Sequence, residues 1–303
     1  MLATVLRLFI LFELTVYSAL AWYFLDATVL SAALYAVAGI LSLRLWITGL
    51  TYAFAWFQHS PWPTLGIWQA IRMFFGECAA FILNFVLVSP FERFWMGTDR
   101  LTPTGERPPL LLIHGYGCSR AAWWWLRRRL EQAGWAVATI SLEPIYTSIE
   151  NYVAPVSRRV DEVLAATGAH QLVLVGHSMG GLVARAYLRT HGVAKVIRLI
   201  TLGTPHLGSE LAKYGIGENA RQMTPGSSWL VALASEEPRV DTLNVYSPHD
   251  SYVLPQSNLD FSGSQRRTID GLGHLSMLYS PRVAMALLDG LEEQKMGSAD
   301  GGQ

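Results

Sequence analysis

The chain changes character near residue 98, from long apolar stretches to short apolar runs that alternate with amphipathic segments. Residues 1–66 contain only four acidic or basic side chains, and the stretches 8–25 and 27–57 are apolar except for Glu13 and Arg44. Each stretch is long enough to cross a bilayer core, which takes about 20 residues. The short polar link at residues 26–28 therefore predicts a helical hairpin in a membrane.

A third apolar stretch, residues 71–91, carries only Arg72 and Glu77 as charged residues. It could span the bilayer, lie in the interface, or cover the rest of the protein as an apolar helix. We expect residues 1–97 to form a membrane-anchoring helical region with two or three transmembrane helices. Signal-peptide cleavage after Ala21 is the alternative, but it would leave thirty-odd apolar residues that still hold the protein on the membrane.

Two charged residues, Glu13 and Arg44, fall inside the predicted spans, where they either pair across the hairpin or extend to the interface. Basic residues near the ends of the hairpin place its link outside and the N-terminus in the cytoplasm. With two spans the rest of the chain is cytoplasmic, and with three it is periplasmic or outside. The expected location is a bacterial inner membrane, crossed more than once, with the side of the second domain left open.

Residues 98–108 are turn-rich and predict a linker, and the chain beyond them predicts an α/β fold with a mostly parallel sheet. Helical patterns separate the apolar runs by the lengths that βαβ units need. The domain is expected over residues 109–296, followed by a disordered tail at 297–303. The predicted strands are 110–113, 136–141, 172–175, 197–202, 242–246 and 267–270, and the predicted helices are 121–133, 149–166, 181–190 and 282–293.

Composition adds little to this interpretation. The chain of 303 residues is 51% hydrophobic and 15% charged, against about 25% charged in ordinary globular domains, which fits a membrane region. Its net charge of zero gives no reason to expect nucleic acid. The two cysteines, Cys78 and Cys118, imply no disulfide framework. No metal or nucleotide motif is present, so no cofactor is expected.

The motif Gly176-His177-Ser178-Met179-Gly180-Gly181 directly follows the apolar run 172–175 and precedes a helical pattern. A Gly-x-Ser-x-Gly sequence between a strand and a helix is the nucleophile elbow. The tight turn strains the serine and exposes its hydroxyl beyond the sheet, and the nearby glycines avoid clashes. Ser178 is therefore the predicted nucleophile.

A serine hydroxyl is a weak nucleophile at neutral pH and needs a base, which is oriented in turn by an acid. His274 follows the last predicted strand and is the expected base. Asp250 follows the run 242–246 and is the expected acid. Asp260 and Asp270 are the alternative acids, although Asp270 lies only four residues from His274.

The loop after the first predicted strand, His114-Gly115-Tyr116-Gly117, stands where an oxyanion stabiliser is expected. The backbone N–H groups of Tyr116 and Met179 are the natural pair to bind the oxyanion of a tetrahedral intermediate. We expect His114 to support this loop rather than take part in the chemistry.

Together with Thr201–Gly208 and the Gly273-His274 pair, these motifs resemble bacterial lipases and esterases of the α/β-hydrolase superfamily, most closely the triacylglycerol lipases. The resemblance covers roughly residues 108–294 and implies an α/β-hydrolase fold and ester hydrolysis through an acyl-serine intermediate. Several secreted members bind calcium through an aspartate two residues after the catalytic histidine. That position is Ser276 here, so no metal is carried over.

Residues 205–241 are long for a simple connection, and a lid over the site is expected, the alternative being ordinary helices packed on the sheet. The prediction is a membrane-anchored serine hydrolase that cleaves carboxylic esters, with an ester or lipid substrate and the bilayer as partners. The alternatives are an acyltransferase or thioesterase with the same triad, and a non-catalytic membrane scaffold. The natural substrate and the oligomeric state are not readable from the sequence.

Overall fold

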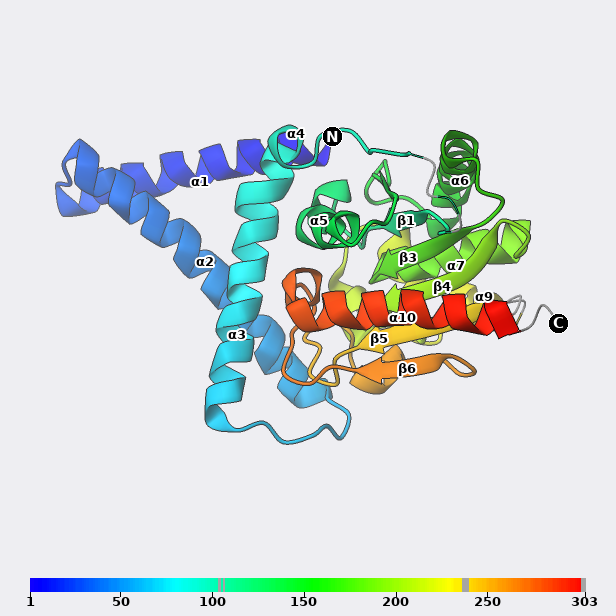
Figure 1. The fold of residues 1–303 in the computed structure, drawn as a ribbon. Coiled ribbons are helices and arrows are strands. Elements are labelled where there is room, and N and C mark those ends of the chain that lie inside the picture. Colours follow the sequence, from blue (N-terminus) through cyan, green and yellow to red (C-terminus); the bar gives the residue numbers. More distant parts are fainter. Residues whose placement is uncertain (103–104, 106, 236–239, 301–303) are drawn as a thin grey trace.

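The centre of the molecule is a six-stranded parallel sheet (Figure 1), seen in a computed structural model that describes residues 1–102, 105, 107–235 and 240–300. The strand order is β2-β1-β3-β4-β5-β6, and each neighbouring pair is parallel. The α/β fold class predicted from the alternating runs is therefore confirmed. The strands are β1 (Leu110–Ile113), β2 (Val137–Ile140), β3 (Leu172–His177), β4 (Val196–Leu202), β5 (Asp241–Tyr246) and β6 (Gln265–Thr268).

The strand order brings the loops after β1 and β3 next to each other. β1 pairs with β3 in a register that runs from Leu110 opposite Val173 to Ile113 opposite Gly176. The chain moves outward from β1 to β2 and then returns across β1 to β3, so its direction along the sheet reverses here. Ligands of open parallel sheets bind at such a switch point, beyond the carboxyl ends of the strands.

Helices cover both faces of the sheet (Figure 1). Leu111 belongs to the core shared with α6 and α7, and Leu112 to the core shared with α5 and α10, because successive strand side chains point to opposite faces. A strand buried on both faces explains the uninterrupted apolar runs. The helices are α5 (Trp124–Gln132), α6 (Val153–Thr167), α7 (Met179–His191), α8 (Glu218–Gln222), α9 (Ser228–Ser235) and α10 (Pro281–Asp300), with short helical turns η3 (Arg120–Trp123), η4 (Ile149–Tyr152), η5 (Glu210–Tyr214), η6 (Gln256–Leu259) and η7 (Ser276–Tyr279).

The two N-terminal helices, α1 (Leu2–Leu25) and α2 (Val29–Gln58), form the predicted hairpin and extend away from the sheet (Figure 1). Asp26 ends α1 in the left-handed conformation with φ 46°, and Thr28 caps α2 by accepting the Ser31 N–H. At Gly39 a Cβ would lie 2.7 Å from the Tyr17 ring, so glycine allows the helices to approach closely.

The two charged residues of the hairpin pair with each other. Arg44 donates from both terminal nitrogens to the Glu13 carboxylate, at 2.6 Å for Nη2 to Oε2. Both side chains are buried. Of the two expected alternatives, pairing and extension to the interface, the structure shows pairing across the hairpin. The pair neutralises charges whose burial alone would be costly.

Both ends of the hairpin lie against the sheet domain. The Met1 amine is 2.8 Å from the Glu143 carboxylate. At the other end, the Ser60 N–H donates to the Gln256 side chain at 3.0 Å. The link between α1 and α2 lies away from the sheet (Figure 1). The chain thus leaves the domain along α1 and returns to it along α2.

The third apolar stretch covers the sheet domain. α3 (Ile67–Ile82) continues through η1 (Leu83–Val88) and η2 (Ser89–Phe91) into α4 (Glu92–Trp95), and this long helix lies between the hairpin and the sheet (Figure 1). Its residues Glu77, Cys78 and Asn84 are buried. Among the described residues, three helical segments are long and apolar enough to cross a membrane: Leu2–Leu25, Val29–Gln58 and Ile67–Trp95.

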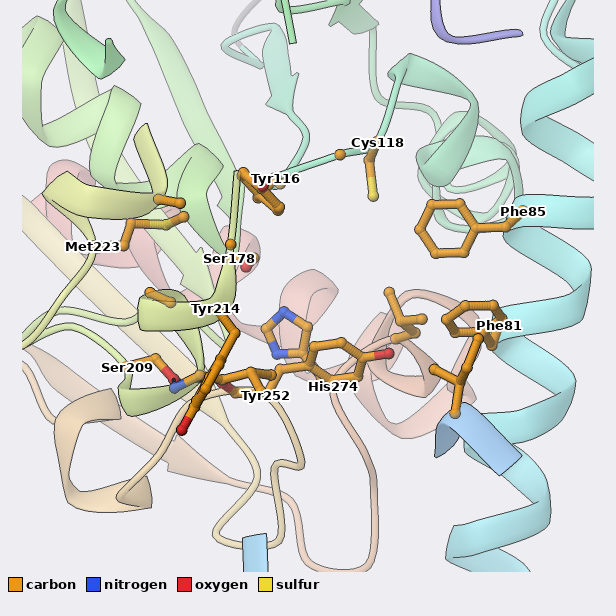
Figure 2. A pocket seen from close by; sticks show the side chains of 18 of the residues that line it. Phe81, Phe85, Tyr116, Cys118, Ser178, Ser209, Tyr214, Met223, Tyr252 and His274 are labelled. Carbon is orange, nitrogen blue, oxygen red and sulfur yellow. Dashed lines mark hydrogen bonds between the residues drawn. The ribbon is translucent and has the colours of Figure 1, made fainter. Parts of the chain in front are cut away.

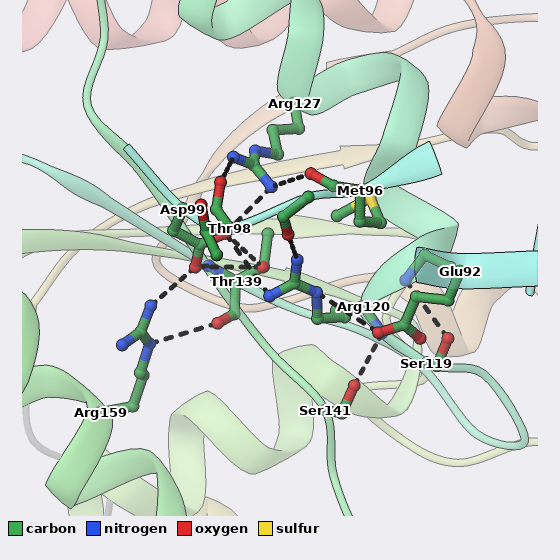
Figure 3. Close-up of polar contacts among 12 residues, drawn as sticks. Glu92, Met96, Thr98, Asp99, Ser119, Arg120, Arg127, Thr139, Ser141 and Arg159 are labelled. Carbon is green, nitrogen blue, oxygen red and sulfur yellow. Dashed lines mark hydrogen bonds and ion pairs between the residues drawn. The ribbon is translucent and has the colours of Figure 1, made fainter. Parts of the chain in front are cut away.

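Asp99 attaches the start of the predicted linker to the sheet domain (Figure 3). Its carboxylate accepts the Thr139 N–H at 2.7 Å and forms ion pairs with Arg159 at 2.7 Å and Arg127 at 3.0 Å. Arg127 also donates to the Met96 carbonyl at 3.0 Å. The helical region and the sheet domain are therefore joined by a buried charged network. Residues 103, 104 and 106 of the predicted linker lie outside the described residues.

The segment 205–241 packs beside the loop that follows β1. The Tyr116 hydroxyl donates to the Ile216 carbonyl at 2.8 Å and accepts the Ile216 N–H at 2.7 Å. Residues 236–239 lie outside the described part of this segment.

At the C-terminus, α10 continues to Asp300, although a tail was expected from residue 297. A single glycine, Gly297, destabilises a helix by only about 1 kcal/mol. Residues 301–303 are not among those described.

Candidate active site

The chain turns sharply between β3 and α7, and Ser178 occupies the turn. β3 ends at His177 and α7 begins at Met179. Ser178 has φ 55° and ψ −127°, a positive φ that a residue with a side chain rarely adopts. This is the strained serine that the elbow motif predicts, placed beyond the carboxyl end of the third strand.

The glycines around Ser178 are required by close contacts. A Cβ at Gly176 would lie 2.4 Å from the Gly181 nitrogen, and a Cβ at Gly180 would lie 2.1 Å from the Ile113 carbonyl oxygen. Both obstacles are backbone atoms, which cannot move aside as a flexible side chain can. The motif thus lets α7 start close against β1 and β3 and keeps the elbow tight.

Asp250 and His274 come together beyond the ends of β5 and β6. His274 Nδ1 donates to Asp250 Oδ2 at 2.7 Å, and Asp250 Oδ1 accepts the N–H groups of Tyr252 and Val253 at 2.8 and 2.9 Å. Asp250 is fully buried. These three bonds hold the carboxylate, and through it the imidazole, in one orientation.

The alternative acids lie elsewhere. Asp260 forms an ion pair with Arg266 at 3.0 Å, with both side chains substantially exposed. Asp270 is exposed and does not contact His274 through any hydrogen bond among the described residues. Of the three carboxylates considered, the structure brings Asp250 to His274.

Burial and the neighbouring charge of Asp250 shift the pKa of His274 in opposite directions. Burial disfavours the imidazolium, but the charge and hydrogen bond of Asp250 outweigh it and raise the pKa of His274 above its ordinary value. His177, whose ring centroid is 4.7 Å from that of His274, has a pKa well below its ordinary value because of its burial and of His274 itself. His177 is thus neutral and packs beneath the elbow.

The loop after β1 lies beside Ser178. A Cβ on Gly115 would be 2.8 Å from the Ser178 Cβ. His114 accepts the Leu142 N–H at Nε2 and donates from Nδ1 to the Gly115 carbonyl, and its burial lowers its pKa to about 4. His114 therefore supports the loop as a neutral ring, as predicted. The backbone of Tyr116 follows within this loop, and Met179 opens α7, whose first N–H groups have no acceptor within the helix.

Ser178 and His274 line one cavity of about 470 Å³ (Figure 2). Among the described residues no hydrogen bond joins the Ser178 hydroxyl to His274. Such bonds are often loose in unliganded sites and tighten when substrate binds. The cavity wall is mostly apolar, with Met223 and Tyr214 from the segment 205–241 on one side.

The sequence interpretation did not include the N-terminal helices in the site. Phe81 of α3 and Phe85 of η1 point toward Ser178 and His274 (Figure 2), and Glu77 contacts the loop that carries His274. Glu77 is the one acidic residue of the apolar stretch 71–91. An acidic residue in such a stretch indicates that its side chain binds a specific polar group.

Cys118 also lines the cavity, and burial raises the pKa of its thiol to about 12. It is therefore a neutral thiol, unsuited to attack a carbonyl. Within the described residues, no group of three or more His, Cys, Asp and Glu side chains could hold a metal ion.

Comparison with known proteins agrees with this geometry. Residues 108–224 match the family model described as the alpha/beta hydrolase fold. These residues carry the α/β-hydrolase fold. The expected resemblance to lipases and esterases is confirmed by the relatives that the chain matches.

A triacylglycerol lipase of Pseudarthrobacter phenanthrenivorans is 34% identical to the chain over 125 residues, which are 37% of this chain and 38% of the lipase. The chain thus spans well under half of the length of that lipase. A pimeloyl-[acyl-carrier protein] methyl ester esterase of Vibrio vulnificus is 27% identical over 212 residues, which are 65% of this chain and 82% of the esterase. Among solved structures, the mature form of a Bacillus licheniformis lipase superimposes with a TM-score of 0.56 at 18% identity, covering 65% of this chain and 96% of the lipase. This last match shows the α/β-hydrolase fold.

Proposed function

We propose that this α/β-hydrolase cleaves carboxylic esters through an acyl intermediate on Ser178. The observation that carries the proposal is the shared cavity: a serine on a strained elbow faces the same space as a histidine whose other ring nitrogen is bonded to a buried carboxylate. A serine, a histidine and a buried acid in this arrangement are the catalytic residues of serine hydrolases. The names of the relatives, a lipase and a methyl ester esterase, support the same reaction class.

In the proposed reaction His274 Nε2 takes the proton from the Ser178 hydroxyl as its oxygen attacks the ester carbonyl. Asp250 holds Nδ1–H and stabilises the imidazolium that forms. The backbone N–H groups of Tyr116 and Met179 stabilise the oxyanion. His274 then protonates the departing alcohol. A water molecule, deprotonated by the same ring, releases the acid and restores the serine.

Both ends of the hairpin meet the sheet domain, and this supports an anchor of two spans, α1 and α2. If the long helix that begins with α3 also crossed the bilayer, its own Glu92 and the Arg120 of the sheet domain that pairs with it would enter the lipid. With two spans, the basic residues place the hydrolase on the cytoplasmic side of the membrane.

The test is active-site labelling of the detergent-solubilised full-length protein with a small fluorophosphonate, followed by peptide mass spectrometry. Label is expected on Ser178 and not on Ser209, a second serine of the cavity whose hydroxyl donates to the Tyr252 carbonyl at 2.6 Å. The same sample should hydrolyse p-nitrophenyl esters. A folded sample that neither takes up label nor hydrolyses any ester of the series would overturn the proposal.

A further inference from the structure

The cavity at Ser178 is completed by the N-terminal helices. It is lined by Leu6, Phe9 and Ile10 of α1, Ile47 of α2, Phe81 of α3 and Phe85 of η1. Arg44 reaches the same cavity, but its charge is paired with Glu13. The wall opposite the catalytic loops is therefore an apolar surface contributed by helices that are themselves apolar enough to lie in a membrane.

The more exposed lining residues mark where the cavity opens. Phe9 is 47% exposed, Tyr146 is 40% exposed and Tyr214 is 74% exposed, although each also lines the cavity. The Tyr214 ring contacts Phe54 of α2, with centroids 5.7 Å apart. The mouth thus lies between the hairpin and the segment 205–241. Tyrosines are typical of the boundary between lipid and water.

The exposed apolar surface of the hairpin is continuous with this mouth. Phe9 shares α1 with Leu8 and Phe12, which are 62% and 63% exposed. An apolar chain can pass from this surface to Ser178 along apolar side chains. Apolar chains leave water for an apolar environment. A long-chain ester is therefore concentrated in the bilayer, and entry from the bilayer brings it to the cavity without passage through water.

We infer that the N-terminal helices form the acyl-binding wall and that the substrate is a long-chain acyl ester that enters from the bilayer. This inference rests on the proposed ester hydrolysis at Ser178. The ester carbonyl lies at the elbow, and its acyl chain lies along Phe81, Phe85 and Ile10.

The first experiment measures kcat/KM for decanoyl and acetyl p-nitrophenyl esters. The wild type should prefer the decanoyl ester. The larger side chains of Phe85→Trp and Ile10→Trp occupy part of the cavity. In these variants the ratio of decanoyl to acetyl kcat/KM should fall about tenfold or more. Phe12→Trp, on the exposed face of α1, should keep the wild-type ratio. A ratio unchanged within twofold in both filled variants would overturn the acyl wall.

The second experiment uses protein reconstituted in phosphatidylcholine vesicles that contain a long-chain fluorogenic ester. The rate should follow the mole fraction of ester in the membrane and not change when more vesicles of the same composition are added. A rate that follows the dissolved ester alone would overturn entry from the bilayer. Loss of all hydrolysis and of Ser178 labelling in the wild type would instead overturn the proposed function.

A separate observation concerns Glu77, the fully buried acidic residue of α3. Its two carboxylate oxygens accept the N–H groups of Leu275 and Ser276 at 2.8 and 2.9 Å. A Cβ at Gly273 would lie 2.4 Å from Glu77 Oε2 and 2.6 Å from the Tyr52 hydroxyl. Glycine at 273 therefore lets the loop pass directly over the carboxylate.

Glu77 holds the two residues that follow His274, and Asp250 holds the histidine ring. The two Glu77 oxygens accept hydrogen bonds from two successive N–H groups, and this pair of bonds fixes the loop segment in place. We propose that Glu77 is a positioning residue for His274, acting through the backbone of this loop. The helical region is then part of the catalytic apparatus as well as an anchor.

Glu77→Gln keeps the shape but leaves one amide oxygen for two N–H donors, so one donor faces an NH₂ group. We expect kcat per labelled site to fall about 10- to 100-fold, as small misplacements do, with KM within about threefold of wild type. The labelling rate with a small fluorophosphonate should fall in parallel, because it depends on His274 and not on the acyl wall.

Glu77→Asp retains a carboxyl group with two acceptor oxygens and should recover part of the lost kcat. Glu92→Gln on α4, whose carboxylate pairs with Arg120 at 3.4 Å, is the matched control and should stay within twofold of wild type. If Glu77→Gln lowers only the yield of folded protein, while kcat and the labelling rate per active site stay unchanged, Glu77 is merely structural and the positioning role is wrong.

Discussion

Ser178→Ala lowers kcat/KM for p-nitrophenyl esters by about 10⁴-fold or more and abolishes fluorophosphonate labelling, while the protein remains folded. The reason is that no other group in the cavity can replace its hydroxyl, since the Cys118 thiol is neutral and the Ser209 hydroxyl is bonded elsewhere. Removing the nucleophile of such a triad costs nearly the whole contribution of the triad. The measurements are the hydrolysis rate and the labelling stoichiometry, beside Ser209→Ala as the matched serine variant.

Ser178→Gly separates the strain at the elbow from the chemistry. The φ of 55° is costly for serine and alanine but accessible to glycine. We therefore expect Ser178→Gly to be as inactive as Ser178→Ala but more stable by about 1 kcal/mol, because strain at such positions costs about 1–3 kcal/mol. Thermal unfolding of the three proteins in one detergent measures this. Equal stability of the glycine and alanine variants would show that the turn stores no strain, and residual serine-type activity in either would remove Ser178 from its role.

The parts of the site that could be predicted from the sequence are those that a local motif specifies. Ser178 stands between a short strand and a helix, and the glycines beside it are explained by contacts of 2.1 and 2.4 Å with backbone that a Cβ would make. The positions of Asp250 and His274 followed from a general rule, that parallel strands end at one edge of the sheet. The structure places the two side chains in hydrogen-bond contact.

The contribution of α3 could not be predicted, because no local pattern specifies it. Glu77 meets residues 275 and 276 across nearly 200 positions of the chain, and apolar residues at 71–91 suit a span, an interfacial helix and a covering helix equally well. The choice among these three depends on whether one face of α3 packs against the sheet domain, and that is a property of tertiary structure. The same holds for Asp99, whose arginine partners come from η3, α5 and α6.

Asp250→Asn tests the orientation of His274 and is expected to lower kcat about 10⁴-fold, as loss of the correct tautomer does in such triads. In the wild type, Asp250 Oδ2 accepts Nδ1–H, which leaves Nε2 free to take the serine proton. An asparagine that turns its NH₂ group toward Nδ1 favours the tautomer with the proton on Nε2, and that ring cannot act as the base. Folding should survive, because the asparagine oxygen can still accept the Tyr252 and Val253 N–H groups.

The pH profile distinguishes this explanation from a general disturbance of the site. His274 must be neutral to act as base, so wild-type activity is lost as the pH falls through the pKa of His274, which Asp250 raises above its ordinary value. Without the carboxylate charge, burial is left to favour the neutral ring, and the residual activity should persist to lower pH than in the wild type. His177, Tyr252 and Glu77 also face this region, and all are unchanged in the variant. An acid limb at the same pH in both proteins would mean that a group other than His274 controls it, and Asp250 would then have no part in tuning the base.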